Sequence, residues 1–257
     1  MTTMDLTRRW MPLRTPADSD DLLLFCFPHA GAGASTYRSW LNTVPGVTVV
    51  PLQPPGREAR LREAPYQRME PLVAELAAVV SEAAGDRPYA FWGHSLGALV
   101  AFETLRALRR RGDVEPVRLV VSGCAAPHQR FDDGPPVTGM TPAQLVAMLR
   151  RLGGTPDWLL ADPELLEMIM PAIRADFEVK ETYRYDAEPA LSTPLTVLSS
   201  MGDPRASDAA QARWQELTTG SFTKRTVLGG HFALFEQPER TTQYLLEALL
   251  GGIQRAA

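Results

Sequence analysis

The sequence predicts an α/β fold, with a mostly parallel sheet flanked by helices and interrupted by a helical lid insertion. Short apolar segments alternate with longer segments of helical periodicity along nearly the whole chain, which is the pattern of repeated strand-helix units. One region breaks this alternation with two helical patterns in succession. A chain of 257 residues can bury a substantial core, so we expect residues 1–257 to form a single domain.

Each predicted strand is a short segment of β-branched or aromatic residues bounded by Gly, Pro or polar residues. The six strands are Leu22–Phe27, Val47–Gln53, Tyr89–Gly93, Arg118–Ser122, Leu195–Ser200 and Phe222–Leu228. The segments between and after them carry apolar residues at helical spacing. These predicted helices are Pro71–Ala84, Ala98–Arg111, Ser207–Leu217 and Pro238–Ile253.

The interruption follows the turn-rich segment Asp132–Pro142, and the sheet resumes only after Glu188–Pro194. Two helical patterns lie in it, with apolar residues at Leu145, Met148, Leu149 and Leu152, and at Leu165, Ile169, Ile173 and Phe177. We therefore predict a helical insertion over approximately residues 134–190. One interpretation is a helical hairpin packed on the core, and the other is a movable lid over a substrate channel.

Composition and charge exclude several classes of function. Lysine and arginine number 26 against 30 aspartate and glutamate, and no dense basic tract is present, which argues against nucleic acid as a partner. No secretory signal and no stretch of roughly 18 apolar residues is found, so we expect a soluble cytoplasmic protein. The two cysteines, Cys26 and Cys124, lack metal-site spacing and are predicted to be buried core thiols.

The strongest chemical signal is the G-x-S-x-G segment that runs from Gly93 to Gly97. It follows a predicted strand and opens a predicted helix, which is the context in which such a serine is lifted out of a sheet as a nucleophile. Glycines on both sides relieve the crowding of so sharp a turn. We therefore predict Ser95 as the catalytic nucleophile.

A serine nucleophile needs a base to take its proton and an acid to orient that base. His231 follows the last predicted strand and is the candidate base, whereas His128 lies in a Pro-rich loop and is interpreted as a surface residue. Asp203 directly follows the strand Leu195–Ser200 and completes the order Ser, Asp, His of α/β-hydrolases. Asp208 is the alternative acid, although it more plausibly begins a helix.

Two backbone N–H groups are expected to hold the oxyanion. One is that of Leu96, directly after the nucleophile, where the helix start leaves N–H groups unpaired. The other is that of Ala30, in the small-residue loop after the first strand. We expect His94 to have a packing role and His29 to brace its loop.

Arginines gather in two further places. Arg57 and Arg60 follow the second strand, and solvated ion pairs are the default interpretation; the functional alternative places one of them near a phosphate-bearing substrate arm or an acidic partner. Arg109–Arg111 end a predicted helix and are expected to complement its carboxyl terminus.

Five segments together resemble the type II thioesterases that accompany modular polyketide and nonribosomal peptide synthases. They are FPHAGAG, PPGREAR, GHSLGALVAFE, MGDP and GGHF, spread from Phe27 to Phe232. The resemblance covers nearly the whole chain. It implies a stand-alone hydrolase that releases stalled or unwanted acyl groups from the phosphopantetheine arm of acyl or peptidyl carrier proteins, with the helical insertion as its lid.

One departure from related enzymes is informative. The integrated, chain-terminating thioesterase domains of these synthases usually place their acid just after the strand that follows the nucleophile helix. Here that strand continues as RLVVSGCAAPHQR, with no carboxylate before Asp132. This favours Asp203 as the acid, and it favours the stand-alone type.

These expectations combine into one mechanism. Ser95, deprotonated by His231 with Asp203 orienting the imidazole, attacks a thioester carbonyl, and water then hydrolyses the acyl-enzyme. We expect no metal and no bound cofactor, a carrier protein domain as partner, no nucleic acid or membrane partner, and a monomer. Two alternatives remain open: a carboxylesterase or lipase acting on oxygen esters, and a non-catalytic module that binds carrier protein or a small ligand.

Overall fold

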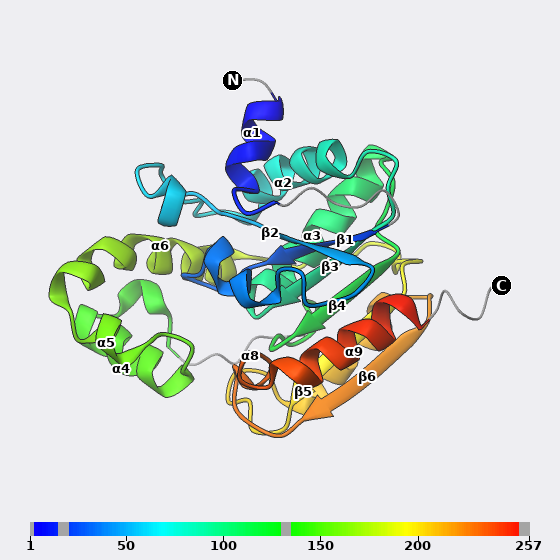
Figure 1. The fold of residues 1–257 in the computed structure, drawn as a ribbon. Helices are drawn as coiled ribbons and strands as arrows, with labels where there is room; N and C mark the ends of the chain where they lie inside the picture. The colour runs from blue at the N-terminus through cyan, green and yellow to red at the C-terminus, as the bar shows by residue number, and fades with distance from the viewer. Residues whose placement is uncertain (1–2, 15–20, 130–134, 252–257) are drawn as a thin grey trace.

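A sheet of six parallel strands organises the part of the chain that the structure describes (Figure 1). The computed structural model describes residues 3–14, 21–129 and 135–251. The strands are β1 (Leu22–Phe27), β2 (Val47–Pro51), β3 (Tyr89–His94), β4 (Arg118–Ser122), β5 (Leu195–Ser200) and β6 (Phe222–Val227). The predicted α/β architecture is confirmed. β2 ends earlier than predicted, because the Gln53 N–H donates to the Trp10 carbonyl (2.7 Å) instead of extending the ladder.

The strand order β2-β1-β3-β4-β5-β6 determines where a site can form. The chain passes from β1 to β2 on one side and then returns to place β3 on the other side of β1. At such a reversal the loops after the two neighbouring strands diverge, which opens a crevice at their carboxyl ends. The loops after β1 and β3 are those that carry Ala30 and Ser95.

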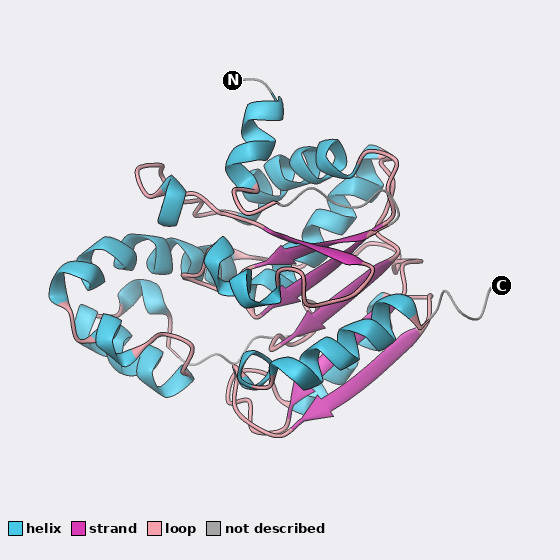
Figure 2. Cartoon of the chain, in the orientation of Figure 1, coloured by secondary structure: helices cyan, strands magenta, loops and turns pink. Residues whose placement is uncertain are grey.

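Helices cover both faces of the sheet (Figure 2). Helices α2 (Met69–Ala84) and α3 (Leu96–Arg111) pack on one face, and the 3₁₀ helix η1 (Ala34–Trp40) with α8 (Ala233–Glu236) and α9 (Pro238–Leu250) packs on the other. Alternate β1 side chains enter opposite clusters, as the two-residue period of a strand requires. This double covering explains why the strands read as continuous apolar runs. Cys26 and Cys124 are buried thiols, as predicted.

Two helical features differ from the sequence prediction. Helix α1 (Thr3–Trp10) was not predicted, because eight residues show too little periodicity; it packs on α2, and the buried Trp10 donates to Glu75 (2.6 Å). The predicted helix Ser207–Leu217 is divided into α7 (Asp208–Ala212) and the 3₁₀ helix η4 (Arg213–Leu217). The last residues predicted for the final helix, 252 and 253, lie outside the described residues.

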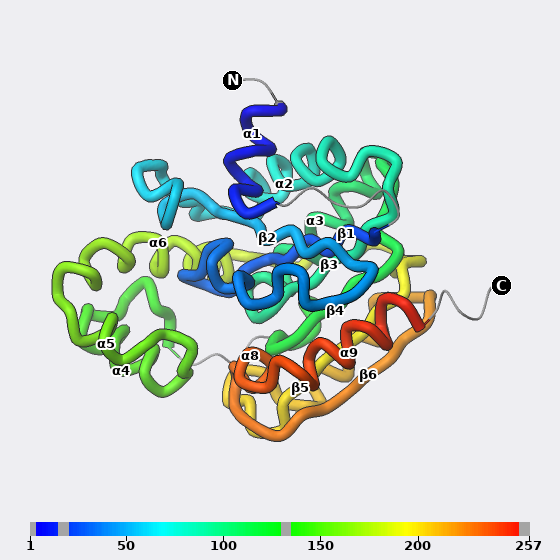
Figure 3. The backbone as a smooth tube through the Cα atoms, in the orientation of Figure 1, coloured from blue at the N-terminus to red at the C-terminus, as the bar shows by residue number. Residues whose placement is uncertain are grey.

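Between β4 and β5, the described part of the chain holds only helices. They are the 3₁₀ helix η3 (Val137–Gly139), α4 (Pro142–Leu152), α5 (Asp157–Leu160) and α6 (Pro163–Thr182). Helices α4, α5 and α6 lie beyond the carboxyl ends of the strands (Figure 3). Most of their buried apolar side chains form a cluster of their own, whereas Val179 of α6 joins the cluster on the α2–α3 face of the sheet. Residues 132–134, where the sequence places the start of this region, lie outside the described residues.

No helix among residues 3–14, 21–129 and 135–251 is long and apolar enough to span a bilayer.

Candidate active site

Ser95 occupies a strained turn between β3 and α3. Its φ of 55° and ψ of −120° are values that a residue with a side chain rarely adopts. Its N–H donates to the Ser122 carbonyl at the end of β4 (2.9 Å), which ties the turn to the neighbouring strand. Strain of this kind persists only where the surrounding structure enforces it, and it is concentrated at functional sites.

The glycines around Ser95 are required by close backbone contacts. A Cβ on Gly97 would lie 2.1 Å from the Phe27 carbonyl oxygen, and a Cβ on Gly93 would lie 2.3 Å from the Gly97 carbonyl oxygen. Both obstacles are backbone atoms, which cannot rotate away as a side chain can. The two glycines therefore let α3 begin directly against the end of β1.

His231 and Asp203 form a buried pair across the loops that follow β6 and β5. The His231 Nδ1 lies 2.9 Å from each carboxylate oxygen of Asp203. The carboxylate is also held by its own loop, because it accepts the N–H groups of Arg205 (2.8 Å) and Ala206 (3.2 Å). Since an ionised carboxylate only accepts, Nδ1 carries the proton of the neutral imidazole and Nε2 keeps a free lone pair.

The imidazole of His231 lies at the end of β4, beside the Ser95 turn. A Cβ on Gly123 would be 3.1 Å from the His231 Cε1, and Gly123 directly follows Ser122, whose carbonyl holds the Ser95 N–H. Within the described residues the Ser95 hydroxyl has no hydrogen-bond partner. In ligand-free enzymes the bond between nucleophile and base is often long and tightens only with substrate.

The alternative acid and the alternative histidine have other partners. Asp208 accepts from Ser199 (2.8 Å) and pairs with Lys224, whose hydrogen bond lowers the pKa of the Asp208 carboxyl. His128 pairs with Glu216 (3.0 Å). Neither side chain meets the His231 imidazole, so the structure brings Asp203 and not Asp208 to the predicted base.

His94 and His29 pack beneath the site as uncharged rings. The His94 Nδ1 lies 2.6 Å from the Ser122 hydroxyl oxygen, and its ring centroid is 4.8 Å from that of His231. Burial is the largest cause that lowers the pKa of His94 well below its usual value. Burial likewise lowers the pKa of His29 to about 3, and its ring packs on Phe232. These contacts are consistent with the packing role predicted for His94 and with the loop-bracing role predicted for His29.

The two predicted oxyanion donors follow the carboxyl ends of β1 and β3, which are neighbours in the sheet. Leu96 is the first residue of α3, where N–H groups have no partner within the helix. The Ala30 N–H donates no hydrogen bond within the described residues. The N–H of the next residue, Gly31, is occupied by the carboxylate of Asp176 on α6 (2.7 Å). The sequence analysis did not single out Asp176, because the periodicity of a helix does not reveal which distant loop a polar side chain contacts.

The expectation of solvated ion pairs at Arg57 and Arg60 was wrong. Both residues are 5% exposed, because α6 and α1 cover the loop after β2. Arg57 pairs with Asp176 (2.8 Å), and Arg60 donates to Glu63 (2.7 Å) and lies over the Trp10 ring. Arg60 uses all three of its guanidinium nitrogens in such contacts, whereas Arg57 uses Nη2 and its buried Nε has no hydrogen-bond partner among the described residues.

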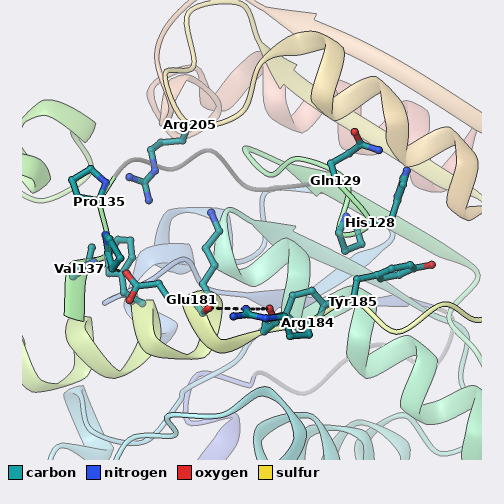
Figure 4. A pocket seen from close by; sticks show the side chains of 13 residues that line it. His128, Gln129, Pro135, Val137, Glu181, Arg184, Tyr185 and Arg205 are labelled. Carbon is teal, nitrogen blue, oxygen red and sulfur yellow. Dashed lines mark hydrogen bonds between the residues drawn. The ribbon is translucent and has the colours of Figure 1, made fainter. Parts of the chain in front are cut away.

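A pocket of about 600 Å³ lies between α6 and the loops that follow β4 and β5 (Figure 4). Arg205 reaches it from the loop after β5, and its guanidinium lies 5.7 Å from the centre of the Phe177 ring. Glu181 lines it from the end of α6. Neither Ser95 nor His231 is among the residues that line this pocket. The pocket therefore lies beside the loop that carries Asp203 and does not contain the serine.

Comparison with protein families assigns nearly the whole fold. Residues 23–249 match the model of the thioesterase domain. The chain belongs to the thioesterase family. Thioesterases are hydrolases that act on thioester bonds, and the matched range includes Ser95, Asp203 and His231.

Relatives with known names include thioesterases of biosynthetic pathways. Thioesterase PikA5 of Streptomyces venezuelae is 37% identical, covering 89% of this thioesterase and 81% of the relative. The RedJ thioesterase of the prodiginine pathway of Streptomyces coelicolor superimposes with a TM-score of 0.82 at 37% identity, covering 93% of this chain and 97% of that one. The type II thioesterase BorB of the borrelidin cluster gives a TM-score of 0.82 at 36% identity, covering 91% and 95%. The resemblance to type II thioesterases and the expected α/β-hydrolase fold are thereby confirmed.

Proposed function

We propose that this thioesterase is a stand-alone type II enzyme that hydrolyses stalled or aberrant acyl groups from the phosphopantetheine arm of acyl or peptidyl carrier proteins. The observation that carries the proposal is the buried His231–Asp203 pair beside the strained Ser95 turn, in a chain of this family. The thioesterases of the prodiginine pathway and of the borrelidin cluster, to which this chain is similar, support the class of substrate. The enzyme would work as a cytoplasmic monomer without metal or cofactor.

The proposed reaction proceeds in two steps. His231 Nε2 takes the hydroxyl proton of Ser95 while the serine oxygen attacks the thioester carbonyl, and the Ala30 and Leu96 N–H groups hold the oxyanion. The intermediate collapses with loss of the thiol, which receives the proton from His231. Water then attacks the acyl-enzyme, with His231 again as the base, and releases the carboxylic acid and Ser95.

The helices α4–α6 act as a lid in this proposal. Two observations support that role: most of their buried apolar side chains form a cluster of their own, and Ala30 of the loop after β1 packs against that cluster. A closed lid would exclude water from the thioester until the carrier arm is in place.

Mass spectrometry of a panel of acyl-phosphopantetheinyl carrier proteins, incubated with the purified enzyme, tests the substrate class. We expect loss of the acyl mass from the carrier at rates above those for acyl-CoA and simple oxygen esters. A markedly faster rate on simple esters would instead assign a carboxylesterase or lipase.

Ser95→Ala tests the nucleophile. We expect its thioesterase rate to fall by at least about 10³-fold, because the oxyanion donors alone leave only a residual rate. A fluorophosphonate probe should label the wild type at Ser95 and leave the variant unlabelled. An unlabelled wild type would indicate a non-catalytic binding module, and full activity of Ser95→Ala would remove the proposed mechanism.

A further inference from the structure

A buried ion pair links helix α6 to the loops that follow β1 and β2. The Arg57 guanidinium, from the loop after β2, donates to Asp176 Oδ1 on α6 (2.8 Å). The other oxygen, Oδ2, accepts the N–H of Gly31 in the loop after β1 (2.7 Å). Asp176 is 8% exposed and Arg57 5%. One carboxylate thus joins three segments that are far apart in the sequence.

The loop that Asp176 contacts is a type II turn. The Ala32 N–H donates to the His29 carbonyl (3.0 Å), which closes a four-residue turn. Gly31 is its third residue and has a φ of +80°, the value that a type II turn requires at that position. In a type I turn the peptide unit between Ala30 and Gly31 would face the opposite way. By accepting the Gly31 N–H, Asp176 holds this unit in the type II orientation.

The same turn carries the proposed oxyanion donor. The Ala30 N–H belongs to the preceding peptide unit, which is oriented alike in type I and type II turns, so Asp176 acts on this N–H by fixing where the turn lies. Helix α6 also presses on the turn through Ile173, since a Cβ on Gly31 would lie 2.7 Å from the Ile173 Cγ1. The turn is therefore held by α6 through an apolar contact and through a charged hydrogen bond, which is the stronger kind.

We propose that Asp176, held by Arg57, is a positioning residue for the oxyanion hole, so that the hole is complete only when helix α6 is docked. The inference rests on the proposed function. It assigns a role to α6 beyond that of a cover: docking of the lid and alignment of the Ala30 N–H become one event. When α6 is not docked, the oxyanion hole is incomplete and hydrolysis is slow. The enzyme would therefore hydrolyse few thioesters that have not been enclosed by the lid.

Two variants separate positioning from stability. Asp176→Leu combined with Arg57→Met removes both charges and the acceptor, and such apolar replacement of a buried pair is often neutral for folding. Asp176→Asn keeps an oxygen for Gly31 but leaves Arg57 without a charge partner, which is the more destabilising change. We expect the double variant to be the more stable and the slower of the two, with kcat lowered about 10- to 100-fold and KM within about threefold.

A tetrahedral analogue provides the specific readout. A straight-chain alkyl trifluoromethyl ketone forms an oxyanion adduct with the serine, so its inhibition constant should weaken in parallel with kcat/KM across the variants. Glu178→Gln is the matched control, because it removes another ion pair between α6 and the body, Arg68 with Glu178 (3.1 Å), without touching the turn. We expect that variant to keep the wild-type kcat and inhibition constant.

The outcomes distinguish this inference from the proposed function. If the wild type hydrolyses acyl carrier protein, Ser95→Ala does not, and the double variant keeps full kcat and analogue affinity, only the positioning role is overturned. If kcat instead falls in the order of lost stability, so that Asp176→Asn is slower than the double variant, the positioning role is likewise overturned. A wild type without thioesterase activity would overturn the proposed function itself.

Discussion

Asp203 and Asp208 lie five positions apart at the carboxyl end of β5, yet their surroundings suit them to different work. Asp203 is buried, is fastened by two backbone N–H groups of its own loop and faces His231 Nδ1. Asp208 begins α7 and is occupied by Lys224 and Ser199. A carboxylate that must hold one tautomer of an imidazole needs the first arrangement.

Replacement of each carboxylate by its amide should therefore have unequal effects. We expect Asp203→Asn to lower kcat/KM by about 10³- to 10⁴-fold, because the amide no longer favours the tautomer with the proton on Nδ1. Asp208→Asn should stay within about threefold of wild type. Steady-state hydrolysis of an acyl carrier protein by both variants measures this, and the reverse ranking would transfer the acid role to Asp208.

At the scale of the element, the carboxyl end of α3 is anchored more firmly than its sequence suggested. Arg109–Arg111 were expected to complement the helix terminus. They lie in the last turn of α3, and Arg109 and Arg110, together with Arg106, also converge on Glu188 in the segment between α6 and β5. Burial alone would raise the pKa of Glu188, but hydrogen bonds from the three guanidinium groups lower it to about 2. The cluster fastens the nucleophile helix to the chain that returns from α6.

Glu188→Gln should destabilise the protein in a pH-dependent way. The folded-state pKa of about 2 lies below the ordinary value of 4.5, so the stabilisation is fully present above pH 4.5 and is lost as pH falls towards 2. At pH 7 we expect a midpoint of thermal unfolding lower by about 2–4 °C, equivalent to roughly 1 kcal/mol. Thermal melts of both proteins should converge between pH 4.5 and pH 2; a constant difference would contradict the cluster's ionic role.

In the molecule as a whole, the polar residues of the candidate active site lie at the carboxyl edge of the sheet. The apolar cluster of the inserted helices meets the sheet at this edge. Ala30 packs against both the main cluster and that of the inserted helices. His94, which is 1% exposed, packs against the rings of His29 and His231 at this edge. Because the buried His94 ring stays uncharged in the folded protein, the free energy of unfolding depends on pH.

Stability should fall in mildly acid solution. The pKa of His94 is lowered in the folded state, so below pH 6.5 the unfolded chain binds a proton that the folded chain does not, and unfolding becomes easier as pH falls. One such histidine costs about 1.4 kcal/mol per pH unit. Urea unfolding between pH 8 and pH 5 should show a slope that His94→Asn reduces by about that amount. An unchanged slope would mean that His94 accepts the proton in the folded state.

Much of the fold was predictable because its signals are local. The strands β1, β4 and β5 have the predicted bounds, since a short apolar run between turn residues is read from neighbouring positions alone. Helix α1 was missed because its stability comes from α2 and not from its own eight residues. The break within Ser207–Leu217 was missed for a similar reason, since both halves keep an apolar face.

The sequence alone was sufficient to predict the α/β architecture and the turn that carries Ser95. It also indicated Asp203 and His231 by their order after successive strands. Only the tertiary structure decided which side chains meet. It paired His231 with Asp203, buried Arg57 and Arg60, and carried Asp176 to the oxyanion loop. The physical reason is that periodicity specifies the face of an element on which a residue lies, whereas its long-range partners depend on how the whole chain packs.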